Sequence, residues 1–153
     1  MKEIKETISL SLDGITVKEY LSRRGFSSTL IKRVKYGGIR VFGTPVTVRH
    51  RLTAGEEIVI VLPDAKNDSI PPMDIPVEVL YEDDYFIAVN KPRNMPTHPS
   101  RGNSLPTLAN AIIAKYGEGF VFRAVNRLDR DTSGVVLIAR DAYTAGKMAE
   151  DMK

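Results

Sequence analysis

The chain has 153 residues, of which 42% are hydrophobic, and it carries a formal net charge of +3. A chain of this length can bury a hydrophobic core, and the lack of any apolar run near ~20 residues excludes a membrane-spanning helix. Residues 1–6 do not contain the apolar core of a signal peptide, and the absence of cysteine excludes disulfides and thiolate metal sites. We therefore expect a soluble, cytoplasmic protein of one or two small domains.

The basic residues are concentrated in the first part of the sequence. Residues 1–62 contain 11 Lys and Arg against 6 Asp and Glu (+5), residues 63–92 contain 2 against 7 (−5), and residues 93–153 contain 9 against 6 (+3). Residues 20–55 contain eight basic residues and no acidic residue. This stretch predicts a surface that binds a polyanion, and a merely soluble basic face is the alternative. The eight residues are Arg23, Arg24, Lys32, Arg33, Lys35, Arg40, Arg49 and Arg51.

Two short helices are predicted beneath these charges. Thr16 and Glu19 have the spacing of a capping box, which predicts a helix over residues 17–24. A second helix follows, capped by Ser27 or Ser28, and its apolar residues share one side. Its opposite, solvent-facing side carries Lys32, Arg33 and Lys35.

Strands and a linker are predicted after the helices. Residues 39–41, 46–48 and 58–62 have strand patterns and indicate a small antiparallel sheet, so residues 1–62 are predicted to form one domain. Residues 63–76 contain four prolines among polar residues and almost no apolar periodicity, which is typical of a stiffened linker between domains.

The second half of the sequence predicts further strands and a helix. Residues 77–81 and 85–89 read as strands joined by an acidic turn, which is expected to be the solvated tip of a hairpin. This turn is not expected to bind a metal ion, because carboxylates at adjacent positions point in different directions. Residues 90–104 form a loop, and residues 105–116 read as a helix. His98 in that loop lacks a catalytic partner in the sequence, which favours a surface role over general-base chemistry.

The densest chemistry lies in residues 126–134, with the sequence Asn-Arg-Leu-Asp-Arg-Asp-Thr-Ser-Gly. Residues 135–139 are β-branched or small and apolar, which predicts a strand buried on both faces and places the charged residues on a loop entering that strand. Neighbouring arginines should keep at least one carboxylate of the loop ionised and nucleophilic, and they also suggest a phosphate-rich partner. The carboxylates are Asp129 and Asp131, and the guanidiniums are Arg127 and Arg130.

Two other interpretations of this loop are open. Asp131, Thr132 and Ser133 can form a local turn in which their side chains bond backbone amides, with the arginines as solvated charges. The string Asp-Thr-Ser-Gly is also similar to the half-site of retroviral-type aspartic proteases. In those enzymes the Asp follows an apolar strand, whereas here the apolar strand comes after the motif, which disfavours a protease.

The string of residues 127–134 resembles the signature of the RluA-type pseudouridine synthases, in which His-Arg-Leu-Asp, two variable residues and Thr-Ser-Gly precede an apolar strand. Asn126 stands where the family usually has His. Residues 79–84 and 89–92 resemble the two segments with which such catalytic domains begin. The resemblance implies that residues 77–153 are the N-terminal part of a mixed α/β catalytic domain.

The resemblance also implies a reaction. These enzymes detach uracil from C1′ of its ribose, turn it, and reattach it through C5. By resemblance Asp129 is the catalytic carboxylate, and Arg127 enters the space that the target base leaves when it flips out of the RNA stack. Asp129 either adds to the sugar or stabilises and deprotonates it. No metal, nucleotide or redox cofactor is implied, because the reaction neither gains nor loses atoms.

Residues 1–62 resemble the S-four-like RNA-binding domain, a module that precedes many RluA-type catalytic domains. Two short helices with a basic outer face and a small antiparallel sheet carry this resemblance. In the family the module grips structured RNA through its second helix and the following loop. These map onto Lys32, Arg33, Lys35 and Arg40, and Arg23 and Arg24 extend the same basic stretch.

We therefore predict an α+β RNA pseudouridine synthase that acts on structured ribosomal or transfer RNA. The alternative is a non-catalytic RNA-binding adaptor, which would not need residues 127–129 above a buried strand. Catalytic domains of the family continue well past the motif, whereas this chain stops nineteen residues after Gly134, within a predicted helix that starts near Ala142. We expect the chain alone to be inactive or weakly active, with exposed apolar surface or association with another copy.

Overall fold

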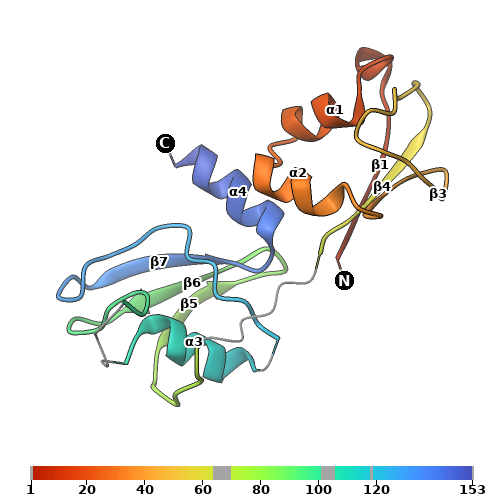
Figure 1. Ribbon diagram of the computed structural model, residues 1–153. Helices are drawn as coiled ribbons and strands as arrows, with labels where there is room; N and C mark the ends of the chain where they lie inside the picture. The colour runs from red at the N-terminus through yellow and green to blue at the C-terminus, as the bar shows by residue number, and fades with distance from the viewer. Residues whose placement is uncertain (1, 64–69, 101–105, 118, 153) are drawn as a thin grey trace. The chain divides into compact units, whose positions relative to one another are not determined.

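A computed structural model describes residues 2–63, 70–100, 106–117 and 119–152 (Figure 1). The chain divides into two compact units, Met1–Asp64 and Ala65–Lys153, and each contains its own antiparallel sheet. The fold is α+β, as the sequence predicts. Within the described ranges, none of the helices is long and apolar enough to cross a membrane.

The first unit combines a four-stranded sheet with two α-helices and one short 3-10 helix. The strand order is β1-β4-β2-β3, and each neighbouring pair is antiparallel. Tyr20 and Leu21 of α1 and Leu30 and Val34 of α2 are buried. The elements are β1 (Glu3–Thr7), η1 (Leu10–Leu12), α1 (Val17–Arg23), α2 (Ser28–Val34), β2 (Ile39–Val41), β3 (Thr44–Pro45) and β4 (Glu57–Val61).

The helix starts follow from the capping residues. The Thr16 hydroxyl accepts a hydrogen bond from the Glu19 amide, and the Glu19 carboxylate accepts one from the Thr16 amide at 2.7 Å, which completes the predicted capping box. The hydrogen bonds that the Glu19 carboxylate accepts from the Thr16 amide and hydroxyl hold the pKa of Glu19 below its usual range. The Ser27 hydroxyl caps α2 by accepting from the Leu30 amide, so Ser27 rather than Ser28 is the cap.

Two strand predictions for this unit are corrected. No strand was predicted before α1, yet β1 pairs with β4 over its whole length although most of its residues are polar. The predicted strand over residues 46–48 does not form, because the chain turns away after β3. The carbonyl of Val48 instead accepts a hydrogen bond from the Lys18 amide, at the start of α1.

The second unit packs a helix on one face of a three-stranded antiparallel sheet in the order β5-β6-β7 (Figure 1). Ile87 and Val89 of β6 share a buried cluster with Ile138 of β7 and with Leu108 and Ile112 of α3. The elements are β5 (Glu78–Glu82), β6 (Phe86–Lys91), α3 (Leu108–Tyr116), β7 (Gly134–Ala139) and α4 (Ala142–Asp151).

The prediction that β7 is buried on both faces is wrong. Val136 and Ile138 are fully buried on the α3 side, but Val135 is 50% exposed and Leu137 is only partly buried. Successive side chains of a strand point to opposite faces, and only one face of this strand is fully covered within the described residues. Apolar surface is therefore exposed on β7, as we expected.

The segment predicted as a linker behaves differently in its two halves. Residues 64–69 lie outside the described residues. Ile70 is buried in the cluster around α3, the Pro71 carbonyl accepts a hydrogen bond from the Asn110 side chain, and the Met73 amide donates to the Asn110 carbonyl. The part of the segment that contains Ile70, Pro71 and Met73 is therefore attached to the second unit through α3.

Candidate active site

The candidate loop comprises residues 126–133 and leads directly into β7. Asp129, Arg127 and Arg130 are exposed, while Leu128 is half-buried and packs against the core cluster. The amide of Thr132 donates to the carbonyl of Asp129 at 3.1 Å and closes a turn. With Asp131, which is also exposed, the loop presents four charged side chains to solvent, while one apolar side chain fixes it to the unit.

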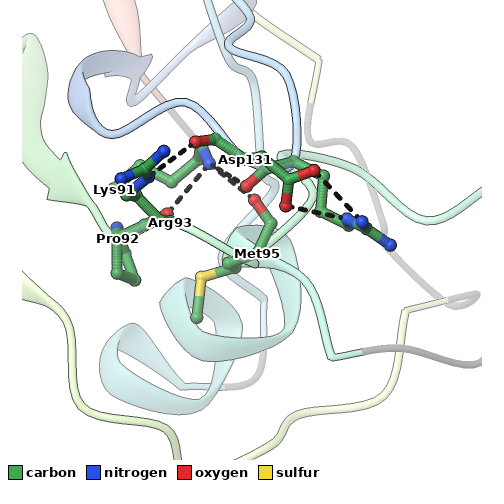
Figure 2. A network of polar contacts seen from close by, with 6 residues as sticks. Lys91, Pro92, Arg93, Met95 and Asp131 are labelled. Atoms are coloured by element: carbon green, nitrogen blue, oxygen red, sulfur yellow. Dashed lines mark hydrogen bonds and ion pairs between the residues drawn. The ribbon is translucent and has the colours of Figure 1, made fainter.

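One of the two carboxylates of the loop is paired with an arginine. The Arg130 guanidinium donates from Nε and from a terminal nitrogen to the two oxygens of Asp131, at 3.0 and 3.1 Å (Figure 2). This bidentate pair holds the pKa of Asp131 below its usual range and raises that of Arg130. The expectation that arginine keeps one carboxylate ionised therefore applies to Asp131.

The other carboxylate, that of Asp129, is available. It is exposed, and no residue in the described part of the chain donates a hydrogen bond to it. The two acids therefore differ in whether a described residue donates a hydrogen bond to the carboxylate. The Asp131 carboxylate is already bound within the loop, whereas the Asp129 carboxylate can meet a substrate.

A buried lysine holds the backbone beneath this loop. Lys91, the last residue of β6, is fully buried, and its ammonium donates to the carbonyls of Pro92, Met95 and Arg130 at 3.0, 2.6 and 3.2 Å (Figure 2). Three carbonyls use all three donors of the ammonium. Burial lowers the pKa of Lys91, while the nearby charges of Asp131 and Asp129 oppose that shift.

The segment after Lys91 binds the loop at further points. The Met95 amide donates to the carbonyl of Arg130 at 3.0 Å, and Arg93 Nε donates to the carbonyl of Asp131 at 3.0 Å. Together with Lys91, these contacts fix the backbone on the C-terminal side of Asp129.

The N-terminal side of Asp129 is fixed by a threonine. The hydroxyl of Thr97 donates to the Leu128 carbonyl at 2.8 Å and accepts from the Leu128 amide at 3.3 Å. The backbone of the same segment is attached to α3, because the Leu108 amide donates to the Pro96 carbonyl and the Ala109 amide donates to the Thr97 carbonyl. A continuous series of hydrogen bonds therefore links α3, Thr97 and the loop.

Asn126 fixes the start of the loop to the edge of β7. Its side-chain amide donates to the carbonyl of Val135 at 3.0 Å, and its side-chain oxygen accepts from the amide of Leu137 at 2.8 Å. The Val125 amide also donates to the Leu137 carbonyl, so the backbone before the loop runs along the same edge. The Asn126 side chain continues this pairing in place of a backbone strand.

Two other polar groups considered in the sequence are His98 and the acidic turn of residues 82–84. His98 is exposed, its ring lies edge-on to Phe122 at 5.4 Å, and burial and the charge of Arg127 lower its pKa. In the acidic turn, Asp83 accepts hydrogen bonds from the Tyr85 and Phe86 amides. Across the described ranges, no group of three or more His, Cys, Asp or Glu side chains is arranged to hold a metal ion.

The basic residues predicted to bind a polyanion lie in the first unit and are mostly exposed. Lys32 and Arg33 of α2 and Arg40 of β2 are exposed, as is Arg23 of α1. The local contacts of this set include the following: the Lys35 ammonium lies 4.5 Å from the centre of the Tyr36 ring, Arg24 pairs with Glu6, and Arg51 donates to the Gly14 carbonyl at 2.7 Å.

Residues 85–153 match the family model for RNA pseudouridylate synthase. The match includes β6, α3, β7 and the whole candidate loop. Residues 85–153 therefore belong to the RNA pseudouridylate synthase family. This confirms the resemblance to the RluA-type enzymes that the loop motif predicts.

Curated relatives extend the similarity into the first unit. The uncharacterized RNA pseudouridine synthase YjbO of Bacillus subtilis is 32% identical over 145 residues, which cover 91% of this chain and 51% of the relative. The ribosomal large subunit pseudouridine synthase D of Xylella fastidiosa is 36% identical over 129 residues, which cover 82% of this chain and 39% of the relative. The chain thus spans about half the length of these relatives or less.

The residues that hold the pseudouridine synthase motif in place, Lys91 and Thr97, were not predicted as site residues from the sequence. The burial of Lys91 could have been predicted. Alternate residues of a strand share a face, so Lys91 lies on the same buried face as Ile87 and Val89. Thr97 gave no such signal, because its contact with Leu128 joins two loops that are distant in sequence.

Proposed function

We propose that this chain is part of an RNA pseudouridine synthase that isomerises uridines in structured RNA, with ribosomal RNA as the preferred class. The observation that carries the proposal is the exposed carboxylate of Asp129, which accepts no hydrogen bond from any described residue and lies on a loop whose backbone is hydrogen-bonded on both sides of it. Such a backbone holds a reactive group in one position without occupying its oxygens. The names of the relatives support the same reaction class.

Asp129 acts at the sugar carbon in this proposal. The bond between C1′ and N1 of uracil breaks, the base turns, and a bond forms between C1′ and C5; C5 then loses its proton and N1 takes one up, so the product is an isomer of the substrate. An ionised carboxylate assists by adding to C1′ as it becomes electrophilic, or by stabilising the sugar and removing a proton from it. Arg127, exposed two residues earlier, occupies the gap that the flipped base leaves in the RNA.

The first unit supplies RNA affinity in this proposal. We assign residues 1–62 to an S-four-like domain, residues 63–76 to a connecting segment and residues 77–153 to part of the catalytic domain. Exposed cations on short helices contact phosphates, and the Arg130 guanidinium adds a positive charge beside the catalytic loop. The proposed RNA-binding residues are Lys32, Arg33, Lys35, Arg40, Arg23, Arg24, Arg127 and Arg130.

Turnover and binding are tested separately. The chain is joined to the remaining sequence of the Bacillus subtilis relative, and tritium release from ribosomal RNA labelled at C5 of uridine is measured for this chimera and for the 153-residue chain. We expect release by the chimera and little or none by the chain alone, together with RNA binding by both. Binding without release by the chimera would favour the adaptor alternative.

A further inference from the structure

The hairpin between β2 and β3 has an unusual residue at its tip. Phe42 and Gly43 are the two turn residues, and both have positive φ, 45° and 78°. A two-residue hairpin with positive φ at both positions strongly favours Asn, Asp or Gly at the first position. A bulky aromatic residue in the left-handed region is a genuine outlier.

Packing does not explain this residue. The Phe42 side chain is 67% exposed, so burial of the ring does not offset the unfavourable conformation. The backbone is nevertheless well fixed, because the Phe42 amide donates to the Glu57 carbonyl at 2.9 Å and Val41 pairs with Thr44 across the hairpin. The result is an exposed aromatic side chain on a backbone that is held in place.

The surroundings of the ring indicate what it binds. Phe42 lies within residues 20–55, which contain eight basic residues and no acidic residue. Arg40, two residues earlier on β2, is exposed. An exposed aromatic ring within a basic stretch of sequence matches single-stranded nucleic acid, whose bases stack on rings while its phosphates contact cations.

We propose that the Phe42 ring is a stacking platform for an unpaired nucleobase of the RNA that the first unit binds. The proposal rests on the RNA-binding function proposed above and adds a residue and a mode of contact to it. The ring supplies a flat apolar surface that tolerates any base, and the hydrogen-bonded hairpin reduces the cost of ordering the backbone on binding.

The substitution Phe42→Asn separates structure from binding. Asn suits the turn better than Phe, so the thermal stability of the variant should be equal or higher, while the ring is lost. We measure the Kd of the full chain for an RNA hairpin with an unpaired loop that contains 2-aminopurine, and for a fully paired RNA duplex. We expect Phe42→Asn to weaken hairpin binding by roughly 5- to 100-fold, to abolish the 2-aminopurine fluorescence change and to spare duplex binding.

Controls make the outcomes distinct. Phe42→Tyr keeps a ring and should retain hairpin affinity, and Leu10→Asn removes another exposed apolar side chain of the same unit and should leave binding unchanged. The salt dependence should be the same in Phe42→Asn and wild type, because stacking releases no counterions. Equal hairpin affinity of wild type and Phe42→Asn would overturn the stacking role, whereas failure of the wild type to bind either RNA would overturn the proposed function itself.

Discussion

The two charged regions of this chain are built in opposite ways. In the second unit, the backbone around Asp129 is held by hydrogen bonds from a buried lysine, a threonine and main-chain groups. In the first unit, Lys32 and Arg33 project from a seven-residue helix into solvent. The difference suits the two roles proposed above: a reacting group must be held within fractions of an ångström, while attraction to a polyanion requires only exposed positive charge.

Replacement of the buried lysine, Lys91, should have the largest effect on the hydrogen-bonded backbone around Asp129. Lys91→Met should lower the free energy of unfolding of the second unit by about 3 kcal/mol, because three carbonyls lose their donor. Circular dichroism during urea unfolding measures the effect, and Lys147→Met, at an exposed lysine of α4, is the matched control. Equal stability of the Lys91 variant and wild type would show that the ammonium does not hold the loop.

The pH dependence of this unit has a defined sign. Burial lowers the pKa of Lys91 in the folded chain, so between the folded and the unfolded pKa the unfolded chain binds more protons. The stability of the second unit should therefore rise with pH through that window, below the ordinary pKa of lysine. Lys91→Met should lack this rise.

Replacement of basic residues tests the proposed RNA-binding surface of the first unit. Replacement of Lys32, Arg33 and Lys35 by Gln should weaken RNA binding about a hundredfold near ~0.1 M salt and reduce the salt slope by roughly one unit per lost phosphate contact. Binding isotherms at several salt concentrations measure both effects, and Lys147→Gln is the control. An unchanged slope would place the RNA on another surface.

A smaller effect is expected at the start of the loop. Asn126→Ala removes both hydrogen bonds to β7 and should destabilise the second unit by about 1–2 kcal/mol. Asn126→Asp keeps an acceptor for the Leu137 amide but cannot donate to the Val135 carbonyl, so its loss of stability should be intermediate. If both variants unfold like the wild type in urea, the side chain does not anchor the loop.

Short-range sequence signals predicted the elements well. The capping spacing of Thr16 and Glu19 located α1, and the apolar run after Gly134 located β7. These predictions succeeded because capping and strand patterns depend on neighbouring residues. β1 was missed because its residues are mostly polar and its pairing with β4 joins opposite ends of the unit.

The site was predictable only in its chemistry. The motif indicated Asp129 and two neighbouring arginines as candidate site residues. The sequence did not reveal that Arg130 binds Asp131 or that Thr97 holds Leu128. The first contact depends on rotamers, and the second joins loops brought together by the packing of α3. Exposure of Val135 likewise depends on what covers the second face of β7, which strand composition does not specify.

The most direct test of the account compares the two carboxylates of the loop. Tritium release from C5-labelled uridine in ribosomal RNA is measured for the chimera with Asp129→Asn and, in parallel, with Asp131→Asn. Asn keeps the size of Asp and removes its charge, so we predict that Asp129→Asn abolishes release while RNA binding persists, and that Asp131→Asn lowers the rate or stability without abolishing turnover. Substantial release by the Asp129 variant would contradict the account.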